Sequence, residues 1–312
     1  MSLKWYFAIS ESSIGREDHD WRGLIRVAVE SARQKTHLRP NMLYDGNPND
    51  FTKELEQKDV NIIYHKVSFY DELEIYSRSQ SPVYLPTASG TFLRTDIPLI
   101  ETDEEFVLYT DCDVMFLAEI PALRCQEPFA VAPESEPGSR IDINAGVMLM
   151  NLPLLRNSCS EFHDFIRNNL EKLHTYDQTA YQIFYDGRLN NLEPWLNWRP
   201  YWGHNEGAVI LHWHGPKPIA VRRLLDEPSA EMPSPAWPLL FAKDPDSYRR
   251  YLSIWDAFSV DSLRTKDGTR VFGEVEFDAN IYLSIHRDVA ESGMDPEEHY
   301  LKYGRYEGRR LR

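Results

Sequence analysis

The chain has 312 residues, of which 42% are hydrophobic, and it contains 17 Tyr, 14 Phe and 8 Trp. This composition excludes an intrinsically disordered chain and predicts a globular protein with a substantial core. The formal net charge of −15 argues against nucleic acid as a partner, because an acidic surface repels a phosphate backbone over long range.

Strand-like and helix-like segments alternate in the first third of the chain. Short apolar runs bounded by turn residues predict strands, and apolar residues at three-to-four spacing predict amphipathic helices. We predict strands at residues 5–10, 41–46, 60–67 and 106–111, and helices at 21–32 and 87–97. Asp45 and Gly46 predict a turn between the second and third strands. Continuously apolar strands indicate an α/β fold whose sheet is covered on both faces.

The same pattern continues to about residue 225 and then changes. We predict further strands at 129–133, 145–152 and 209–215, and further helices at 160–173 and 248–258. Prolines cluster between residues 228 and 238, which places a soft boundary there. The predicted organisation is an α/β domain at 1–225, a Pro-rich linker with a helix at 226–265, and a small helical module at 266–312.

Cysteine usage and apolar run length predict the compartment. Cys112, Cys125 and Cys159 show no CxxC spacing, and their odd number fits no complete disulfide framework. No apolar run reaches the length of a signal-peptide core or of a membrane-spanning helix. We therefore expect reduced thiols and a cytoplasmic protein.

Two aspartates stand one residue apart in YTDCDVMF, at the end of an apolar run. Side chains at i and i+2 of a strand point the same way, so Asp111 and Asp113 would share a face and Cys112 would point into the core. Two carboxylates at the carboxyl edge of an α/β sheet suit a hard divalent ion such as Mn²⁺ or Mg²⁺. Alternatively, Asp111 caps a turn and Asp113 is solvated.

The segment HWHGPKP, residues 212–218, supplies a second group of candidate ligands. His212 leaves a predicted strand, and Lys217 follows a Gly-Pro turn, so one imidazole could bind a metal while one ammonium binds a phosphate. Gly215 and Pro216 predict an early bend, which leaves either His212 or His214 free for a structural role. A core histidine is the alternative for His212.

Two further short motifs have both a ligand-binding and a structural interpretation. In INAG, Asn144 precedes Ala145 and Gly146, and a glycine lets a ligand approach the backbone closely. A plain turn would also explain that segment. In YDQTAY, Asp177 and Gln178 could open a helix at the site, or Asp177 could simply cap that helix.

In this order and with these separations, the four motifs resemble glycosyltransferase family eight, the glycogenin and bacterial lipopolysaccharide galactosyltransferase group. The resemblance covers roughly residues 1–222. It implies a GT-A fold, with a mixed, mainly parallel central sheet flanked by helices. It also implies a nucleotide-sugar donor, a divalent cation that is usually Mn²⁺, and sugar transfer with retention of anomeric configuration.

The resemblance also assigns roles to individual residues. It implies that Asp111, Asp113 and His212 bind the metal ion and that Lys217, shortly after Gly215, contacts the donor diphosphate. The positions implied to hold the donor sugar are Arg94, Asn144, Ala145, Gly146, Asp177 and Gln178.

The sequence departs from the family pattern in three places. Lys217 comes one residue earlier after Gly215 than is usual, and Ile219 replaces a tryptophan after Lys-Pro. The first strand usually ends in an aspartate that contacts the base, whereas here it runs into Ser10 and Glu11. We expect these two residues to face the base, with Glu11 as the substitute for the aspartate.

Two retaining mechanisms are compatible with these residues. Double displacement needs a carboxylate nucleophile, and Asp177 is the carboxylate in the motifs that is free for that task. A front-face reaction needs only Gln178 or Asn144 to steady an oxocarbenium-like centre. We favour the front-face route.

Residues 277–312 resemble a short module that is appended to bacterial glycosyltransferases. His299 beside Asp295 is interpreted as part of a structural helix pair. The chain ends in a basic stretch with one acidic residue, Glu307, and five basic residues: Lys302, Arg305, Arg309, Arg310 and Arg312. It could hold the protein weakly at anionic lipid or at a lipid-linked acceptor, or it could be a solvated helix end.

The sequence therefore predicts a retaining, UDP-sugar-dependent hexosyltransferase with a saccharide or glycolipid acceptor, acting in bacterial surface polysaccharide or lipopolysaccharide assembly. A nucleotidyltransferase of related fold is one alternative. Such an enzyme normally has a Gly-rich phosphate loop near the first strand, where SESSIGRED has only Gly15. A catalytically inactive carbohydrate-binding protein on the same fold is the other alternative.

Overall fold

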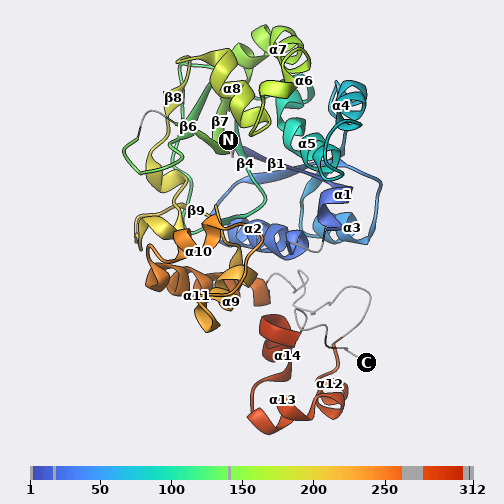
Figure 1. Ribbon diagram of the computed structural model, residues 1–312, viewed down its shortest axis with the longest axis vertical. Helices are drawn as coiled ribbons and strands as arrows, with labels where there is room; N and C mark the ends of the chain where they lie inside the picture. The colour runs from blue at the N-terminus through green and yellow to red at the C-terminus, as the bar shows by residue number, and fades with distance from the viewer. Residues whose placement is uncertain (1–2, 17–18, 140–141, 262–276, 305–308, 310–312) are drawn as a thin grey trace.

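A computed structural model describes residues 3–16, 19–139, 142–261, 277–304 and 309 (Figure 1). Its centre is a seven-stranded sheet with the strand order β3-β2-β1-β4-β7-β6-β8. The strands of this sheet are β1 (Lys4–Ser10), β2 (Arg39–Asp45), β3 (Asn61–Tyr64), β4 (Phe106–Thr110), β6 (Phe129–Ala132), β7 (Asn144–Asn151) and β8 (Asn190–Asn191). Neighbouring strands run parallel except where β7 pairs with β4 and β6. The predicted mixed, mainly parallel sheet is confirmed.

Helices cover both faces of this sheet, as the continuously apolar strands predict. Figure 1 shows α2 and α3 on one face and α4 to α8 on the other. The helices up to residue 226 are α1 (Glu11–Ile14), α2 (Trp21–Lys35), α3 (Asp50–Glu56), α4 (Tyr70–Ser77), α5 (Tyr84–Phe92), α6 (Ile97–Ile100), α7 (Leu152–Arg167), α8 (Asp177–Tyr185) and α9 (Pro218–Asp226).

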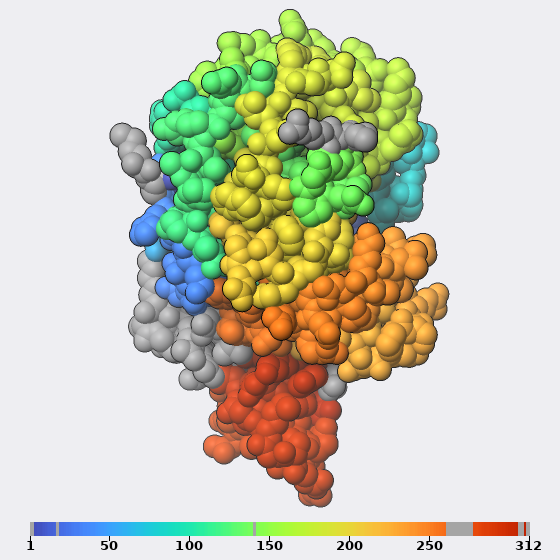
Figure 2. All heavy atoms as spheres, turned by 90° about the vertical axis from the view of Figure 1, so that its left-hand side faces the viewer, coloured from blue at the N-terminus to red at the C-terminus, as the bar shows by residue number. Residues whose placement is uncertain are grey.

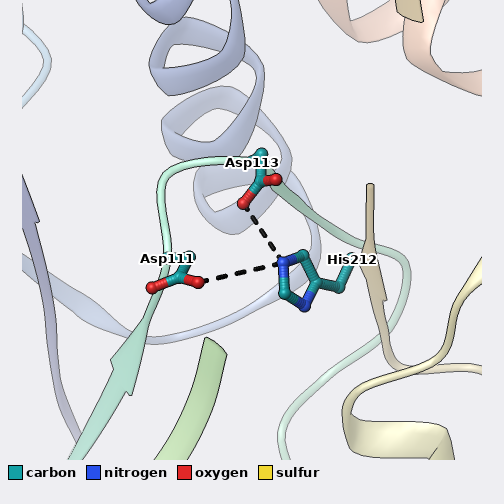
Figure 3. Close-up of side chains that lie close together, drawn as sticks. All are labelled: Asp111, Asp113 and His212. Atoms are coloured by element: carbon teal, nitrogen blue, oxygen red, sulfur yellow. Dashed lines mark ion pairs between the residues drawn. The ribbon is translucent and has the colours of Figure 1, made fainter. Parts of the chain in front are cut away.

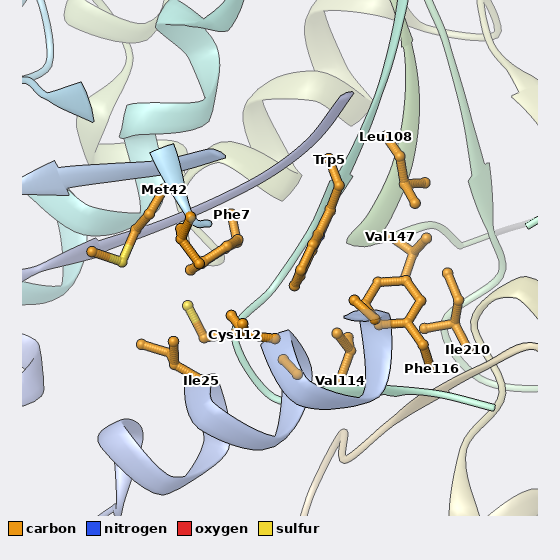
Figure 4. Close-up of a cluster of buried hydrophobic side chains, with 14 of the residues drawn as sticks. Trp5, Phe7, Ile25, Met42, Leu108, Cys112, Val114, Phe116, Val147 and Ile210 are labelled. Carbon is orange, nitrogen blue, oxygen red and sulfur yellow. The ribbon is translucent and has the colours of Figure 1, made fainter. Parts of the chain in front are cut away.

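Each face of the sheet has its own apolar core. Side chains alternate along β1, so Trp5 and Phe7 pack on the α2 face while Tyr6 packs on the other. On the α2 face, Ile25 joins them, and Figure 4 shows this cluster with Cys112 pointing into it. Burial of Cys112 was predicted, and it is confirmed.

Several predicted elements differ from the structure. The segment between β2 and β3 contains the helix α3 as well as a turn, because Asn49 and Thr52 form a reciprocal capping box that starts it. The helix predicted at 87–97 is divided among α5, a 3₁₀ turn and α6. The helix predicted at 160–173 begins earlier, at Leu152, and ends at Arg167.

The paired aspartates lie in a turn and not in a strand, which corrects the prediction. β4 ends at Thr110, and residues 111–113 turn the chain into β5 (Val114–Phe116). β5 pairs with β9 (Ile210–His212) in a separate two-stranded sheet. β9 stops at His212, earlier than predicted, because Gly215 has a φ of 92° and Pro216 follows it.

The chain beyond residue 226 begins with helices that pack against the α/β domain. α10 (Ala236–Phe241) and α11 (Pro245–Asp261) follow the Pro-rich segment. A third apolar core joins Trp213, Val221 and Leu224 to Phe241, Tyr248 and Trp255. The predicted boundary near residue 226 thus coincides with the end of α9 but not with the end of the packed core.

A small C-terminal lobe follows in α12 (Ala279–Ile285), α13 (Arg287–Ser292) and α14 (Pro296–His299), beyond α11 in Figures 1 and 2. Inside it, the hydroxyl of Tyr282 lies 3.1 Å from Nδ1 of buried His299. This contact agrees with a structural role for His299. None of the helices in the described part of the chain has the length and apolarity that crossing a bilayer requires.

Candidate metal centre

Asp111, Asp113 and His212 converge at the carboxyl edge of the sheet (Figure 3). Backbone hydrogen bonds pin the turn that carries the aspartates. The N–H of Asp111 donates to the Gly146 carbonyl over 2.8 Å, and the N–H of Trp213 donates to the Asp113 carbonyl over 2.9 Å. The chain therefore brings β4, β7 and β9 together around these three side chains.

The three side chains lie close enough to share one ion. Nε2 of His212 is 3.2 Å from Oδ1 of Asp113 and 3.9 Å from Oδ2 of Asp111. One ligand atom from each residue lies within 4.8 Å of the others. His212 and Asp113 are buried, whereas the Asp111 side chain is 34% exposed. An ion held here would thus be reached from the Asp111 side.

A chain of hydrogen bonds fixes which ring nitrogen of His212 carries the proton. The carboxylate of Glu134 can only accept, and Nδ2 of Asn144 donates to it over 2.6 Å. Oδ1 of Asn144 therefore accepts a hydrogen bond from Nδ2 of Asn197 over 2.9 Å. Oδ1 of Asn197 in turn faces Nδ1 of His212 at 3.0 Å. Nδ1 must donate, so when the ring carries a single proton, Nε2 presents its lone pair to the two aspartates.

This arrangement fits a divalent cation. A neutral Nε2 and a carboxylate oxygen 3.2 Å apart both present lone pairs, and a positive charge between them relieves their repulsion. Two carboxylates and one imidazole form a donor set for Mn²⁺ or Mg²⁺. Burial would raise the pKa of Asp113, but the Lys217 ammonium holds it well below its usual range. Asp113 is therefore ionised.

Gly146 leaves the room that the centre needs. A Cβ atom at this position would lie 2.3 Å from Cε1 of His212 and 2.9 Å from Oδ2 of Asp111. The same atom would lie 2.8 Å from Oδ1 of Asn144. These distances are far below ordinary contact, so a side chain at Gly146 would push the ligands apart.

Arg94 links the metal centre to the interior. Its Nη2 donates to Oδ1 of Asp111 over 2.9 Å, its Nε pairs with Oδ2 of Asp177 over 2.7 Å, and its guanidinium lies 4.2 Å from the centre of the Tyr109 ring. Burial raises the pKa of Asp177 to about 7, although Arg94 opposes this shift. Asp177 is 1% exposed and lies behind Arg94. It is placed to hold Arg94.

Gln178 and Ala145 meet through the backbone at the start of β7. Oε1 of Gln178 accepts the N–H of Ala145 over 2.9 Å, and Arg94 donates to the Ala145 carbonyl. The structure thus brings together the three motifs that contain Arg94, Asn144 to Gly146, and Asp177 with Gln178. All three lie directly beside Asp111.

Lys217 and His214, the other two basic side chains of HWHGPKP, have different partners. Lys217 pairs with Oδ2 of Asp113 and donates to the Trp213 carbonyl over 2.8 Å. His214 lies 2.9 Å from both Glu134 Oε1 and the Tyr201 hydroxyl. Burial lowers the pKa of His214, with Glu134 opposing the shift. Within the described residues, His212 is the histidine of this segment that joins the cluster with both aspartates.

A pocket of about 290 Å³ opens beside the metal centre. Its walls include Arg94, Asp111, Asp113, His212 and Lys217. The wall beyond them is formed by residues that the sequence did not single out, namely Ser13, Arg16, Trp21, Thr87, Gly90 and Thr91. A larger pocket of about 560 Å³ lies at the opposite edge of the sheet, around Leu3 and Phe106. The metal-ligand cluster identifies the smaller pocket as the candidate site.

Ser10 and Glu11 are not among the residues that line this pocket. The hydroxyl of Ser10 accepts the N–H of Ser13 as the cap of α1 and donates to the Pro86 carbonyl. The carboxylate of Glu11 accepts the N–H of Asn47 over 3.2 Å, on the exposed side. Both side chains are thus used to shape the loop beside the pocket.

Asn197 and Glu134, which orient His212, were also not identified from the sequence. Both lie in irregular segments, and their role depends on hydrogen bonds across long stretches of chain. A buried asparagine between tryptophans offers no spacing signal that separates it from an ordinary turn.

No protein-family profile matches the sequence, and no curated protein matches it. Solved structures do match the fold. The apo-form glycosyltransferase GlyE of Streptococcus pneumoniae TIGR4 superposes with a TM-score of 0.53 at 17% identity, over 83% of this chain and 64% of GlyE. The galactosyltransferase LgtC in complex with donor and acceptor sugar analogues gives 0.51 at 17% identity, over 69% of this chain and 89% of LgtC.

These similarities establish the fold. The present chain spans less than two thirds of the length of GlyE. An active-site mutant of LgtC also matches, with a TM-score of 0.52 at 14% identity, over 79% of this chain and 99% of that one. The chain has the GT-A fold that the sequence predicted.

Proposed function

We propose that the protein is a metal-dependent, retaining glycosyltransferase that moves a hexose from a UDP-sugar to a saccharide or lipid-linked acceptor. One observation carries the proposal: Asp111, Asp113 and His212 converge beside Lys217 and Arg94 in one pocket of a GT-A fold. A sugar nucleotide needs a divalent cation and positive side chains together, because its leaving group is a diphosphate.

The chemistry of this pocket suits the departure of a nucleoside diphosphate. A bound Mn²⁺ or Mg²⁺ would act as a Lewis acid that stabilises negative charge on the leaving oxygens. Asp111, Asp113 and His212 would hold the ion, and Lys217 would contact the diphosphate. On a protein of net charge −15, such local positive groups are what allows an anionic donor to bind.

We infer a front-face route for the transfer. The bond between C1 of the sugar and the phosphate oxygen breaks with its electron pair on the oxygen, while the acceptor oxygen bonds to C1 on the same face. The acceptor proton passes to the departing phosphate oxygen. Burial of Asp177 behind Arg94 supports this route, because a nucleophile must reach C1. A glycosyl adduct trapped on Asp177 and detected by mass spectrometry would refute it.

A saccharide or lipid-linked acceptor suggests where in the cell the reaction takes place. We propose a cytoplasmic enzyme of bacterial surface polysaccharide or lipopolysaccharide assembly, with weak attachment to anionic lipid through its basic C-terminus. Lys302 pairs with Glu298, and Arg309 pairs with Asp288 at 2.6 Å. Arg305, Arg310 and Arg312, together with Glu307, lie outside the described residues. The membrane contact would depend on these three arginines.

Two alternatives make different predictions for the same pocket. A nucleotidyltransferase would bind a nucleoside triphosphate and release pyrophosphate. An inactive carbohydrate-binding protein would bind a saccharide whether or not Mn²⁺ is present. The clustering of the metal ligands with Lys217 favours an enzyme over the inactive protein. The single glycine of SESSIGRED, where a nucleotidyltransferase normally has a Gly-rich phosphate loop, favours the glycosyltransferase.

Thermal stability and donor hydrolysis test the proposal directly. The wild type is measured with a panel of nucleotide-sugars with and without Mn²⁺, beside Asp113→Ala and the exposed control Asp71→Ala. We expect one UDP-sugar to raise the melting temperature and to be hydrolysed, with both effects lost without Mn²⁺ and in Asp113→Ala. A response to nucleoside triphosphates instead would favour the nucleotidyltransferase, and no response to any donor would favour the inactive protein.

A further inference from the structure

The ammonium of Lys217 is paired with Asp113, one of the three side chains that would bind the metal ion. The ammonium pairs with Oδ2 of Asp113, and Oδ1 of the same carboxylate faces His212 at 3.2 Å. The ammonium therefore shares the carboxylate that would also hold the cation. A second bond, to the Trp213 carbonyl at 2.8 Å, fixes the position of the ammonium.

A cation on Asp113 and an ammonium on Asp113 oppose one another. A divalent ion would lie about 2.0 to 2.2 Å from the carboxylate oxygen. The two positive charges would then be only a few ångströms apart, on the buried side of the site. Asp113 is 4% exposed, so the repulsion is weakly screened.

The side chain of Lys217 can move although its backbone is held. Gly215 has a φ of 92°, and a Cβ there would lie 2.8 Å from Cδ1 of Leu240 on α10. Pro216 and Pro218 flank the lysine and restrict its backbone further. The ammonium, however, sits on a flexible four-carbon stem and also lines the pocket beside Arg94.

We propose that Lys217 guards Asp113: it weakens divalent-cation binding until a nucleoside diphosphate gives its ammonium another anionic partner. Cation and diphosphate then bind cooperatively. The diphosphate draws the ammonium away from Asp113 and so favours the cation, and the cation displaces the ammonium from Asp113 and so frees it for the diphosphate. The coupling is reciprocal, so the cation must improve diphosphate binding by the same factor. This inference rests on the proposed function, since it takes the pocket to bind a diphosphate and a cation together.

The position of Lys217 in the sequence is consistent with this role. Only Pro216 separates it from Gly215, and it stands at the cap of α9. The short connection keeps the stem beside Asp113. The same side chain can therefore reach either the carboxylate or a ligand in the pocket by rotation.

The experiment measures cation binding without turnover. Mn²⁺ is titrated into the full-length protein and followed by electron paramagnetic resonance, first alone and then with saturating UDP. The test variant is Lys217→Met, which keeps the length of the stem and removes the charge. The control is Lys172→Met, which removes the same charge from an exposed lysine that is paired with Glu171. Circular dichroism confirms that each variant is folded.

We expect Lys217→Met to bind Mn²⁺ alone about tenfold more tightly than the wild type, because the competing ammonium is gone. We also expect UDP to tighten Mn²⁺ binding less in this variant than in the wild type and in Lys172→Met. If the variant binds Mn²⁺ alone no more tightly while the wild type binds both ligands, the guarding role is refuted and the proposed function stands.

Binding of neither Mn²⁺ nor UDP to the wild type would instead refute the proposed function, and the inference with it. A second measurement covers the case in which Lys217→Met does not fold. UDP affinity of the wild type is measured with and without Mn²⁺, and Mn²⁺ affinity with and without UDP. Equal, large coupling factors support the inference, whereas independent binding of the two ligands refutes it.

Discussion

Asn197 holds His212 from behind, with its Oδ1 3.0 Å from Nδ1 of the ring and its own amide fixed by Asn144. This contact turns Nε2 toward Asp111 and Asp113. The donor-to-acceptor direction of this hydrogen-bond chain is set by Glu134, whose carboxylate can only accept. Side chains outside the Asp111, Asp113 and His212 cluster thus decide which ring nitrogen of His212 faces the two aspartates.

Replacing Asn197 by leucine should weaken Mn²⁺ binding about 10- to 100-fold, because His212 then loses the partner that orients it and fixes its proton. Asn197→Asp keeps an acceptor for Nδ1 and should recover part of the affinity. Titration with Mn²⁺ measures both effects. The exposed Asn168→Leu serves as control, and equal Mn²⁺ affinity in Asn197→Leu and the wild type would contradict the relay.

Gly146→Ala should destabilise the fold by about 1 to 3 kcal/mol and abolish Mn²⁺ binding, because its Cβ would lie 2.3 Å from the His212 ring. The matched control is Gly138→Ala, where a Cβ has no atom within 4 Å among the described residues. Chemical denaturation and Mn²⁺ titration give the two readouts. Full cation affinity in Gly146→Ala would show that the ligands do not need this space.

The contribution of Asp177 to the free energy of unfolding should fall as pH rises. Its pKa is raised from 3.8 to about 7 in the folded protein, so between these values the folded state binds a proton that the unfolded state lacks. We expect the unfolding free energy of wild type minus Asp177→Asn to fall by up to about 1.4 kcal/mol per pH unit from about pH 4 to about pH 7.

Denaturation at a series of pH values measures this difference, in which the other titrating groups cancel. Asp71→Asn, at an exposed position of α4, is measured beside it as the control for the loss of one carboxylate. A rising difference for Asp177→Asn would mean that the ion pair with Arg94 outweighs burial and depresses the pKa of Asp177.

Neutralising the basic C-terminus tests the membrane proposal. Arg305→Gln, Arg310→Gln and Arg312→Gln in one chain should reduce binding to phosphatidylglycerol vesicles, with about 1 kcal/mol lost per arginine at low salt. Binding to neutral vesicles should be absent in both proteins. Vesicle sedimentation makes the comparison, and unchanged binding to anionic vesicles would exclude this attachment.

Motifs with a recognisable spacing could be picked out from the sequence, and the structure brings them together: DxD, the histidine after the last strand, and the NAG and DQ motifs all meet at one edge of the sheet. Their roles in binding stay proposals. Continuously apolar runs predicted the sheet, because both of its faces are buried. The geometry of Asp111 and Asp113 was not predicted, because the turn that carries them depends on bonds to β7 and to Trp213.

What the sequence could not supply is the polar partner of each side chain, whether near or far along the chain. The Ser10 hydroxyl caps Ser13, three residues on, and also reaches the Pro86 carbonyl, which nothing near Ser10 indicates. Helix α3 was missed because its start depends on the pairing of Asn49 with Thr52, a weaker signal than Asp45-Gly46. Asn197 acts only through partners that lie far away in the sequence.

The shared core of α9, α10 and α11 limits how this protein could be recombined with others of the same fold. A chimera joined at residue 226 would strip Phe241, Tyr248 and Trp255 from Trp213, which lies next to His212. It would also remove Leu240 from Gly215, where the lysine segment turns. A junction after α11 would leave these contacts intact, so the C-terminal lobe, but not the Pro-rich segment, is the exchangeable part.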